Sequence, residues 1–146
     1  MVLENLEAGL RLPVVFEDCS PLLRLPQKGK IGTMTDVTPY LASAATAELE
    51  DWGPLEEATG EPMQTSGLYL WQDDGQEIGV WECAPGPSYW KQEQHEFVHI
   101  LSGRMTVTPD GGEPLEIGAG DTAFFPNGWA GTWDIHETIR KVFVLF

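Results

Sequence analysis

From Gly67 onward, short apolar runs alternate with turn-forming residues, and this punctuation limits the chain to a fold built of short strands. The run LYLW is followed by DDG at residues 73–75 and then by QEIGVWEC, a pattern typical of a β-hairpin. A second hairpin signal, DGG at residues 110–112, follows the run RMTVTP. Short strands separated by glycine and proline turns predict an all-β sandwich or barrel.

The first 66 residues follow a different pattern. Prolines interrupt residues 1–38, and we expect extended arms there. A threonine–proline pair followed by an alanine-rich run predicts one helix over residues 39–52, which a glycine–proline pair ends. We therefore expect an N-terminal extension over residues 1–66 and a barrel over residues 67–146, within one structural domain.

The second half of the predicted barrel contains further strand signals. HEFVHIL alternates apolar and polar residues, and we expect a turn at Ser102 and Gly103 before RMTVTP begins. The segment PLEIGAGDTAFFP and the closing run IRKVFVLF supply the remaining strands. These runs complete the set of short strands, separated by glycine and proline turns, that the sequence predicts.

Composition restricts the possible partners and location. The formal net charge of −15 argues against nucleic acid and against an anionic membrane surface, which both require basic residues. The two cysteines, Cys19 and Cys83, are too few for a disulfide scaffold or a four-cysteine zinc site. The acidic N-terminus does not resemble a secretory signal, and no apolar run is long enough to span a membrane. We expect a cytoplasmic protein.

Several spacings in the second half resemble the two motifs of the cupin family. Glu96 and Gly103 are spaced as in the first motif, and Gly120, Pro126 and Gly128 match the second. The chain is similar to small cupins related to the ureidoglycine aminohydrolases and to the ethanolamine-utilisation cupins. The other shared features are Trp81-Glu82, Pro85-Gly86, Tyr89-Trp90, Asp121, Phe125, Trp133 and Arg140-Lys141. The resemblance implies a double-stranded β-helix, or jelly-roll, barrel.

The histidines that most cupins use to hold a metal are missing from the matching positions. With one spacing of the first motif its two histidine positions fall on Trp90 and Gln92, and with the longer spacing they fall on Tyr89 and Lys91. The histidine position of the second motif falls on Gly131. Glu96 is the one usual ligand that remains. A tight transition-metal site needs several converging imidazoles or carboxylates, so we expect no metal cofactor.

A divalent transition metal stays open as an alternative because of a second pattern. Glu93, His95 and His99 form an E-x-H-x3-H run similar to the ligand run of the ureidoglycine aminohydrolases, but the run is displaced by three positions along the chain. An odd displacement along a strand moves side chains to the opposite face. We therefore expect His99 to point outward if Glu96 points into the barrel.

Period-two alternation predicts a pocket inside the barrel. The residues expected to line it are Trp90, Gln92, Glu96, Val98, Gly131 and Trp133. Aromatic walls with one carboxylate and one amide suit a small polar ligand that has an apolar face. Glu96 is the candidate general acid or base, and Lys141, which matches a lysine of the similar cupins, is the second candidate catalytic residue. The competing interpretation is that the tryptophans fill the core and Lys141 forms an ion pair.

Three functions remain open, because cupin-like barrels carry many unrelated functions. The first is a small-molecule-binding cupin without the usual metal site. The second is an enzyme, aminohydrolase- or isomerase-like, that acts on a small nitrogen-containing metabolite or a sugar through Glu96. The third is a structural or interaction protein with a filled barrel. We also expect a homodimer, because cupins of this size commonly pair.

Overall fold

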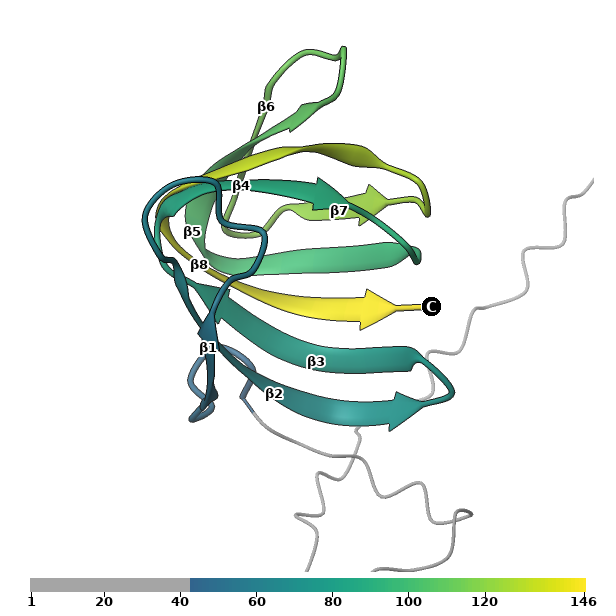
Figure 1. Ribbon diagram of the computed structural model, residues 1–146. Helices are drawn as coiled ribbons and strands as arrows, with labels where there is room; N and C mark the ends of the chain where they lie inside the picture. Colours follow the sequence, from purple (N-terminus) through teal and green to yellow (C-terminus); the bar gives the residue numbers. More distant parts are fainter. Residues whose placement is uncertain (1–42) are drawn as a thin grey trace, which may run out of the picture. The chain divides into compact units, whose positions relative to one another are not determined.

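The computed structural model describes residues 43–146, and all the regular structure in this range is β-strand. The strands are β1 (Glu50–Pro54), β2 (Gln64–Asp73), β3 (Gln76–Cys83), β4 (Gly86–Lys91), β5 (Glu96–Pro109), β6 (Leu115–Gly118), β7 (Thr122–Phe125) and β8 (Ala130–Leu145). Strands β1, β2, β3, β8, β5 and β6 are neighbours in that order, while β4 pairs with β8 and β7 pairs with β5 (Figure 1).

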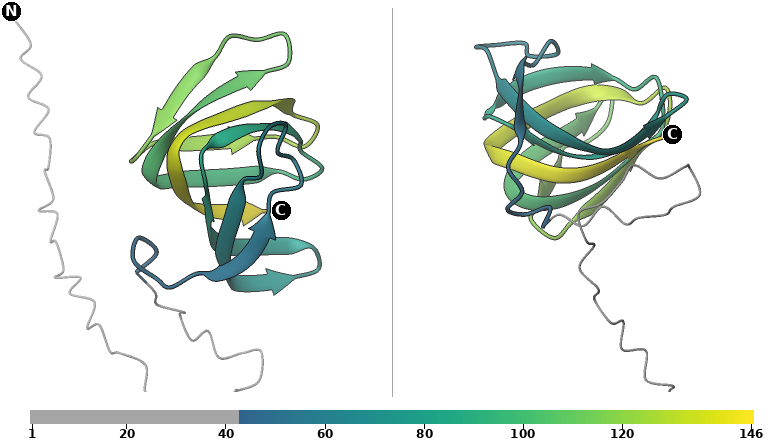
Figure 2. Two further views of the ribbon diagram at one scale, coloured as in Figure 1. Left: turned by 60° about the vertical axis from the view of Figure 1, so that its left-hand side comes forward. Right: turned by 90° about the horizontal axis from the view of Figure 1, so that it is seen from below.

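The two longest strands, β5 and β8, belong to two layers at once. Residues 139–145 of β8 pair with β3, whereas residues 130–135 pair with β4. The first residues of β5 pair with β7 and its later residues pair with β6. Both long strands curve around the interior (Figure 2). The described chain is therefore a jelly-roll-like β-structure, as the resemblance to cupins implies.

The two predicted hairpins are confirmed. Asp73 pairs with Gln76, so only Asp74 and Gly75 connect β2 to β3. Both connecting residues have positive φ, 46° and 78°, as a two-residue type I′ turn requires. Residues 110–114, which include the DGG sequence, connect β5 to β6.

The predicted turn at Ser102 and Gly103 is wrong, because β5 continues through it. The register of β5 against β8 shifts between Ile100 and Met105, so these residues form an irregular kink within one strand. Gly103 has a φ of 86°, and a Cβ there would lie 2.2 Å from the carbonyl oxygen of Thr138. The glycine thus permits a close approach of β8, and it bends the strand where the sequence suggested a reversal.

The helix predicted over residues 39–52 is not found in the part that the structure describes. Residues 44–46 form a turn, and β1 begins at Glu50; the first residues of the predicted helix lie outside the described residues, as do the arms predicted over residues 1–38. The local helical propensity is overridden by tertiary packing, which holds the Trp52 ring over β2.

Glycine on β2 explains why Trp52 sits there. A Cβ at Gly67 would lie 2.3 Å from the Trp52 ring, so the ring occupies the space of the missing side chain. The same ring stacks on Tyr69, with centroids 4.7 Å apart. Because β1 and β2 begin before residue 67, the sheet includes part of the sequence predicted as extension.

Between the layers lies one cluster of buried apolar side chains. Its members are Met63, Trp81, Cys83, Val98, Ile100, Met105, Val107, Phe125, Trp133, Ile135, Ile139 and Phe143. On β5 the alternation is as predicted, with Glu96 and Val98 buried and Phe97 exposed. Burying a side chain of this size contributes about 1.5–3 kcal/mol. Among residues 43–146 there is no helix that could cross a membrane.

Candidate functional site

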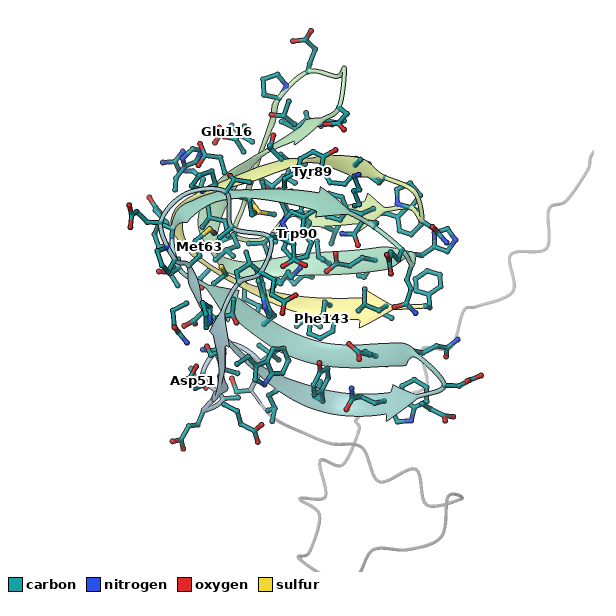
Figure 3. The ribbon with its side chains drawn as sticks, viewed as in Figure 1. Asp51, Met63, Tyr89, Trp90, Glu116 and Phe143 are labelled. Atoms are coloured by element: carbon teal, nitrogen blue, oxygen red, sulfur yellow. The ribbon has the colours of Figure 1, made fainter. Side chains whose placement is uncertain are left out.

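A cavity of about 180 Å³ lies on the inner face of the sheet. Its walls are Trp52, Tyr69, Glu77, Trp81, Trp90, Gln92, Glu96, Lys141, Phe143 and Leu145. Drug-sized ligands need roughly 300–1,000 Å³, so this cavity suits a small metabolite. Trp90 and Phe143, labelled in Figure 3, approach it from β4 and β8.

Strand register brings the cavity residues together from distant parts of the sequence. Trp81 on β3 lies directly opposite Lys141 on β8, and residues paired in this way point to the same face of the sheet. Phe143 lies opposite Gly79, where a Cβ would be 2.8 Å from the phenyl ring. The glycine therefore leaves room for the aromatic wall of the cavity.

Glu96 is the centre of a buried polar network in the cavity. The Lys141 ammonium donates a hydrogen bond to one Glu96 carboxylate oxygen over 2.6 Å, and the Gln92 side-chain amide donates to the other over 2.8 Å. Glu96 is 5% exposed and Lys141 3% exposed. Both carboxylate oxygens thus have charged or polar donors, which a buried charge requires.

Two tryptophan rings hold the Lys141 ammonium in place. Its Nζ lies 4.6 Å from the ring centroid of Trp81 and 4.5 Å from that of Trp133. Both distances are within the range of favourable cation–π contacts. The ammonium is therefore fixed by one carboxylate and two aromatic faces, which compensates for its removal from water.

A serine positions the aromatic wall on β4. Ser88 Oγ donates to the Trp133 carbonyl oxygen over 3.1 Å and accepts from Trp90 Nε1 over 2.9 Å. The Trp90 and Trp133 rings are 4.7 Å apart. In the part of the chain that the structure describes, Trp133 Nε1 is buried with no hydrogen-bond partner. A buried donor of this kind is usually satisfied by an ordered water or another acceptor.

Glu77 supplies a second carboxylate at the cavity. Gln72 Nε2 donates to one of its oxygens over 3.0 Å. Burial raises the pKa of the neighbouring Tyr69 hydroxyl, and the negative charge of Glu77 raises it further. Tyr69 is 42% exposed, so this side of the cavity meets solvent. The negative charge of Glu77 therefore contributes to the electrostatic potential at the aromatic wall of the cavity.

Four of the residues predicted from the sequence line the cavity, namely Trp90, Gln92, Glu96 and Lys141. The other three, Val98, Gly131 and Trp133, are buried but do not line it. The predicted inward direction is correct for Val98 and Trp133, but both belong to the packed core. Inward direction does not distinguish a core residue from a pocket residue, because both kinds share the same strand periodicity.

The sequence interpretation missed the wall opposite Trp90. The sequence places Trp52 in a helix and gives no direct signal that Tyr69, Glu77 and Trp81 line a cavity. Trp81 both packs in the core and borders the cavity. The hairpin signal contained part of this information, since it places the strands that carry Tyr69 and Trp81 side by side. What it lacked was the pairing of β3 with β8, which joins residues about 60 positions apart.

The site does not fit the metal that cupin barrels commonly hold. Its one carboxylate at the usual ligand position already pairs with the Lys141 ammonium, which supplies the positive charge there. Within residues 43–146, no group of three histidine, cysteine, aspartate or glutamate side chains is arranged to hold a metal ion. The donors next to the usual ligand position are thus one paired carboxylate, Glu96, and one amide, Gln92, which bind transition metals weakly.

The run Glu93, His95 and His99 is not assembled as a ligand set in this geometry. His99 points to the outer face, beside Thr122 and Val142 on the adjacent strands. His95 Nδ1 accepts a hydrogen bond from a backbone N–H over 3.0 Å, and its ring stacks on exposed phenylalanines. These contacts place the histidines outside the cavity.

Comparisons with known proteins agree with this architecture. The family model of the EutQ-like cupin domain matches residues 70–143. A protein of unknown function from Pseudomonas syringae is 23% identical with a TM-score of 0.64; the match covers 70% of this chain and 46% of that one. The chain therefore spans less than half the length of that protein.

Two further solved structures have the same fold. The EutQ protein of Clostridium difficile is 15% identical with a TM-score of 0.60, and the match covers 71% of this chain and 83% of that one. The cupin domain of Cnp3 from Schizosaccharomyces pombe is 14% identical with a TM-score of 0.55, covering 73% and 72%. At such identities the likeness concerns the fold alone. No curated protein matches the sequence.

Proposed function

The chain belongs to the family of EutQ-like cupin domains, and from this premise we propose that it binds a small molecule in its barrel cavity without a metal. One observation carries the proposal: a fully paired Glu96–Lys141–Gln92 network faces an unfilled, aromatic-walled cavity. Buried polar groups that converge on an apolar cavity are the usual composition of a ligand site. In this site the network orients the ligand and the rings supply its apolar contact.

The binding test compares two tryptophan variants against a panel of small metabolites, with intrinsic fluorescence and calorimetry as readouts. Trp90 lines the cavity, whereas Trp129 packs against Phe125 and does not line it. We expect Trp90→Leu to weaken binding more than tenfold and Trp129→Leu to leave it unchanged. Equal affinity in wild type and Trp90→Leu would contradict the assigned site.

The metal test is an elemental analysis of the purified protein. We expect manganese, iron, nickel and zinc each well below one equivalent, and unchanged ligand affinity after treatment with a chelator. Stoichiometric metal that is lost together with ligand binding would overturn the metal-free proposal. The analysis is best made on protein expressed in medium supplemented with these metals, so that a low content reflects the site.

A second candidate function is that of an enzyme, because two side-chain atoms at the cavity wall are close enough for proton transfer. Lys141 Nζ and Glu96 Oε1 are 2.6 Å apart at the cavity wall, so a proton can move between them when a bound substrate changes their charges. Such an enzyme would use Glu96 as general acid or base on a small nitrogen-containing metabolite or a sugar, in an aminohydrolase- or isomerase-like reaction.

This second candidate is tested by turnover of whichever compounds bind. We expect Glu96→Gln to retain its circular dichroism spectrum while losing turnover of the compounds that it still binds by at least about 100-fold, the usual contribution of a general acid or base. Unchanged turnover in this variant would remove the acid–base role of Glu96. The third function, a filled barrel with a purely structural role, is disfavoured by the unfilled volume next to Glu96.

A further inference from the structure

We propose that the ligand of this cavity is a small organic cation, an amine or a quaternary ammonium ion. The inference rests on the proposed binding function and goes one step further, to the charge of the ligand. Five of the ten side chains that form the walls are aromatic: Trp52, Tyr69, Trp81, Trp90 and Phe143. The faces of such rings are negative and attract cations within about 6 Å.

The charged residues of the cavity point to the same ligand class. Among the described residues that line it, Glu77 and Glu96 are acidic and Lys141 is basic, so the lining has a net charge of −1. The Lys141 charge is already neutralised by Glu96 and covered by two indole rings. It is therefore not available to bind an anionic ligand, and Glu77 is left as the charge that a ligand meets.

Glu77 is placed to meet a cation at the solvent side of the cavity. Its hydrogen-bond donor is the neutral amide of Gln72, and it forms no ion pair with any residue in the range 43–146. It lies near Tyr69, whose ring stacks on Trp52. A carboxylate beside stacked rings attracts an ammonium group and disfavours a carboxylate or phosphate.

The Lys141 ammonium shows that the aromatic interior accommodates a positively charged nitrogen. It already lies 4.6 Å from the Trp81 ring centroid and 4.5 Å from the Trp133 ring centroid. The rings of Trp52, Tyr69, Trp90 and Phe143 line the cavity without such a contact to the ammonium. Trp52 and Tyr69 cover one face of each other, and Trp133 covers one face of Trp90, so a ligand meets the remaining ring surfaces. The acidic chain, with a net charge of −15, also raises the local concentration of cations.

The test uses three probes of nearly equal shape and different charge: tetramethylammonium, tert-butanol and trimethylacetate. Their methyl proton signals are titrated with full-length protein and followed by NMR, because protons held against ring faces shift upfield. We expect tetramethylammonium to bind roughly tenfold more tightly than tert-butanol, the size of a partly desolvated cation–π contact. Trimethylacetate should bind least.

A matched pair of charge variants assigns the preference to the cavity. Glu77→Gln removes the carboxylate at the cavity, and Glu113→Gln removes one at an exposed position that does not line it. We expect Glu77→Gln to reduce the preference for tetramethylammonium over tert-butanol at least threefold, and Glu113→Gln to leave it unchanged.

The possible failures are distinguishable. If tert-butanol or trimethylacetate binds as tightly as tetramethylammonium, with the affinity lost in Trp90→Leu, the cavity is a binding site and the cation inference is wrong. If Glu77→Gln and Glu113→Gln lower the preference equally, the preference comes from the overall charge and the inference is also wrong. If none of the three probes binds and no metabolite of the panel does, both the inference and the proposed function fail.

Discussion

At the scale of single residues, the main feature is the buried ion pair of Lys141, which the sequence offered as one interpretation without identifying Glu96 as the partner. Glu96 and Lys141 are 45 positions apart and meet only because β5 and β8 pair in one register. Removing two charges from water is costly, and the two tryptophan rings and the Gln92 amide offset part of that cost. The pair is therefore more sensitive to loss of one partner than a surface pair is.

We expect Lys141→Met to lower the free energy of unfolding by about 3–5 kcal/mol, because it leaves the Glu96 carboxylate buried without a partner. The double variant Glu96→Gln with Lys141→Met should lose less than the sum of the two single variants. Chemical denaturation measures all three. For the exposed pair of Arg104 and Glu116, Arg104→Met should cost at most about 1 kcal/mol. Additive losses at the buried pair would contradict the coupling.

Cys83 gives a pH-dependent prediction. Burial raises the pKa of its thiol to about 12, while the positive charge of Lys141 acts in the opposite direction. An unfolded thiol has a pKa of about 8.5. The folded state therefore holds its proton more tightly, so the stabilisation is complete below about pH 8.5 and is lost as the pH rises toward 12.

The measurement compares the free energy of unfolding of wild type and Cys83→Ala at pH 7 and pH 10. The difference between them should shrink above about pH 8.5, by at most about 1.4 kcal/mol per pH unit. Parallel pH curves for the two proteins would contradict the raised pKa. Cys19 is present in both proteins, so its titration cancels in the comparison.

At the scale of elements, a turn was predictable from the sequence where its own residues determine its conformation. It was not predictable where the conformation depends on contact with a neighbouring strand. The DDG sequence specifies its hairpin because two adjacent residues with positive φ are enough. Gly103 also has positive φ, but there the chain continues as β5 because β8 lies against the kink. A glycine in sequence marks an unusual backbone conformation without saying whether the strand ends.

Two glycine variants distinguish the cost of a positive φ from the cost of a close contact with a neighbouring strand. Gly103→Ala places a Cβ 2.2 Å from a backbone oxygen of β8, whereas Gly111→Ala, also at positive φ, meets nothing within 4 Å. We expect Gly111→Ala to cost about 1–2 kcal/mol from the backbone conformation alone. Gly103→Ala should cost at least about 2 kcal/mol more, because β5 and β8 must separate. Equal thermal stability of the two variants would contradict the close approach.

At the scale of the whole molecule, the outer face of the sheet carries exposed aromatic side chains. Phe97 on β5 and Phe124 on β7 are directly paired across the strands and are 42% and 53% exposed. The rings of His95 and Phe146 lie next to Phe124, with centroids 5.5 Å and 6.4 Å away. Clustered exposed rings of this kind are typical of an interaction surface.

We expect this face to join two copies of the chain around a two-fold axis, where the same patch on each copy meets itself. Light scattering at micromolar concentration should give a dimer for the wild type and a monomer for Phe124→Glu. Leu115→Glu changes another exposed apolar residue, on β6, and should stay dimeric. A monomeric wild type would contradict the expected homodimer.

The sequence by itself determined those features that depend on residues close to one another along the chain. Strand periodicity predicted that Glu96 and Val98 point inward, and turn residues predicted the two hairpins. The resemblance of the motif spacings to those of cupins implied the barrel fold and showed which positions lack a histidine. Each of these signals operates over a few residues, through side-chain alternation or backbone dihedral angles.

Only the tertiary structure decided which inward side chains border a cavity and which fill the core. Trp52, which the sequence places in a helix, lies in strand β1, because the Trp52 ring packs over Gly67. Most of the cavity wall comes from β1, β2, β3 and β8, whose pairing joins residues far apart in the chain. Which strands pair, and which spaces between side chains stay open, depends on contacts between residues far apart in the chain. Patterns within a few neighbouring residues therefore do not predict them.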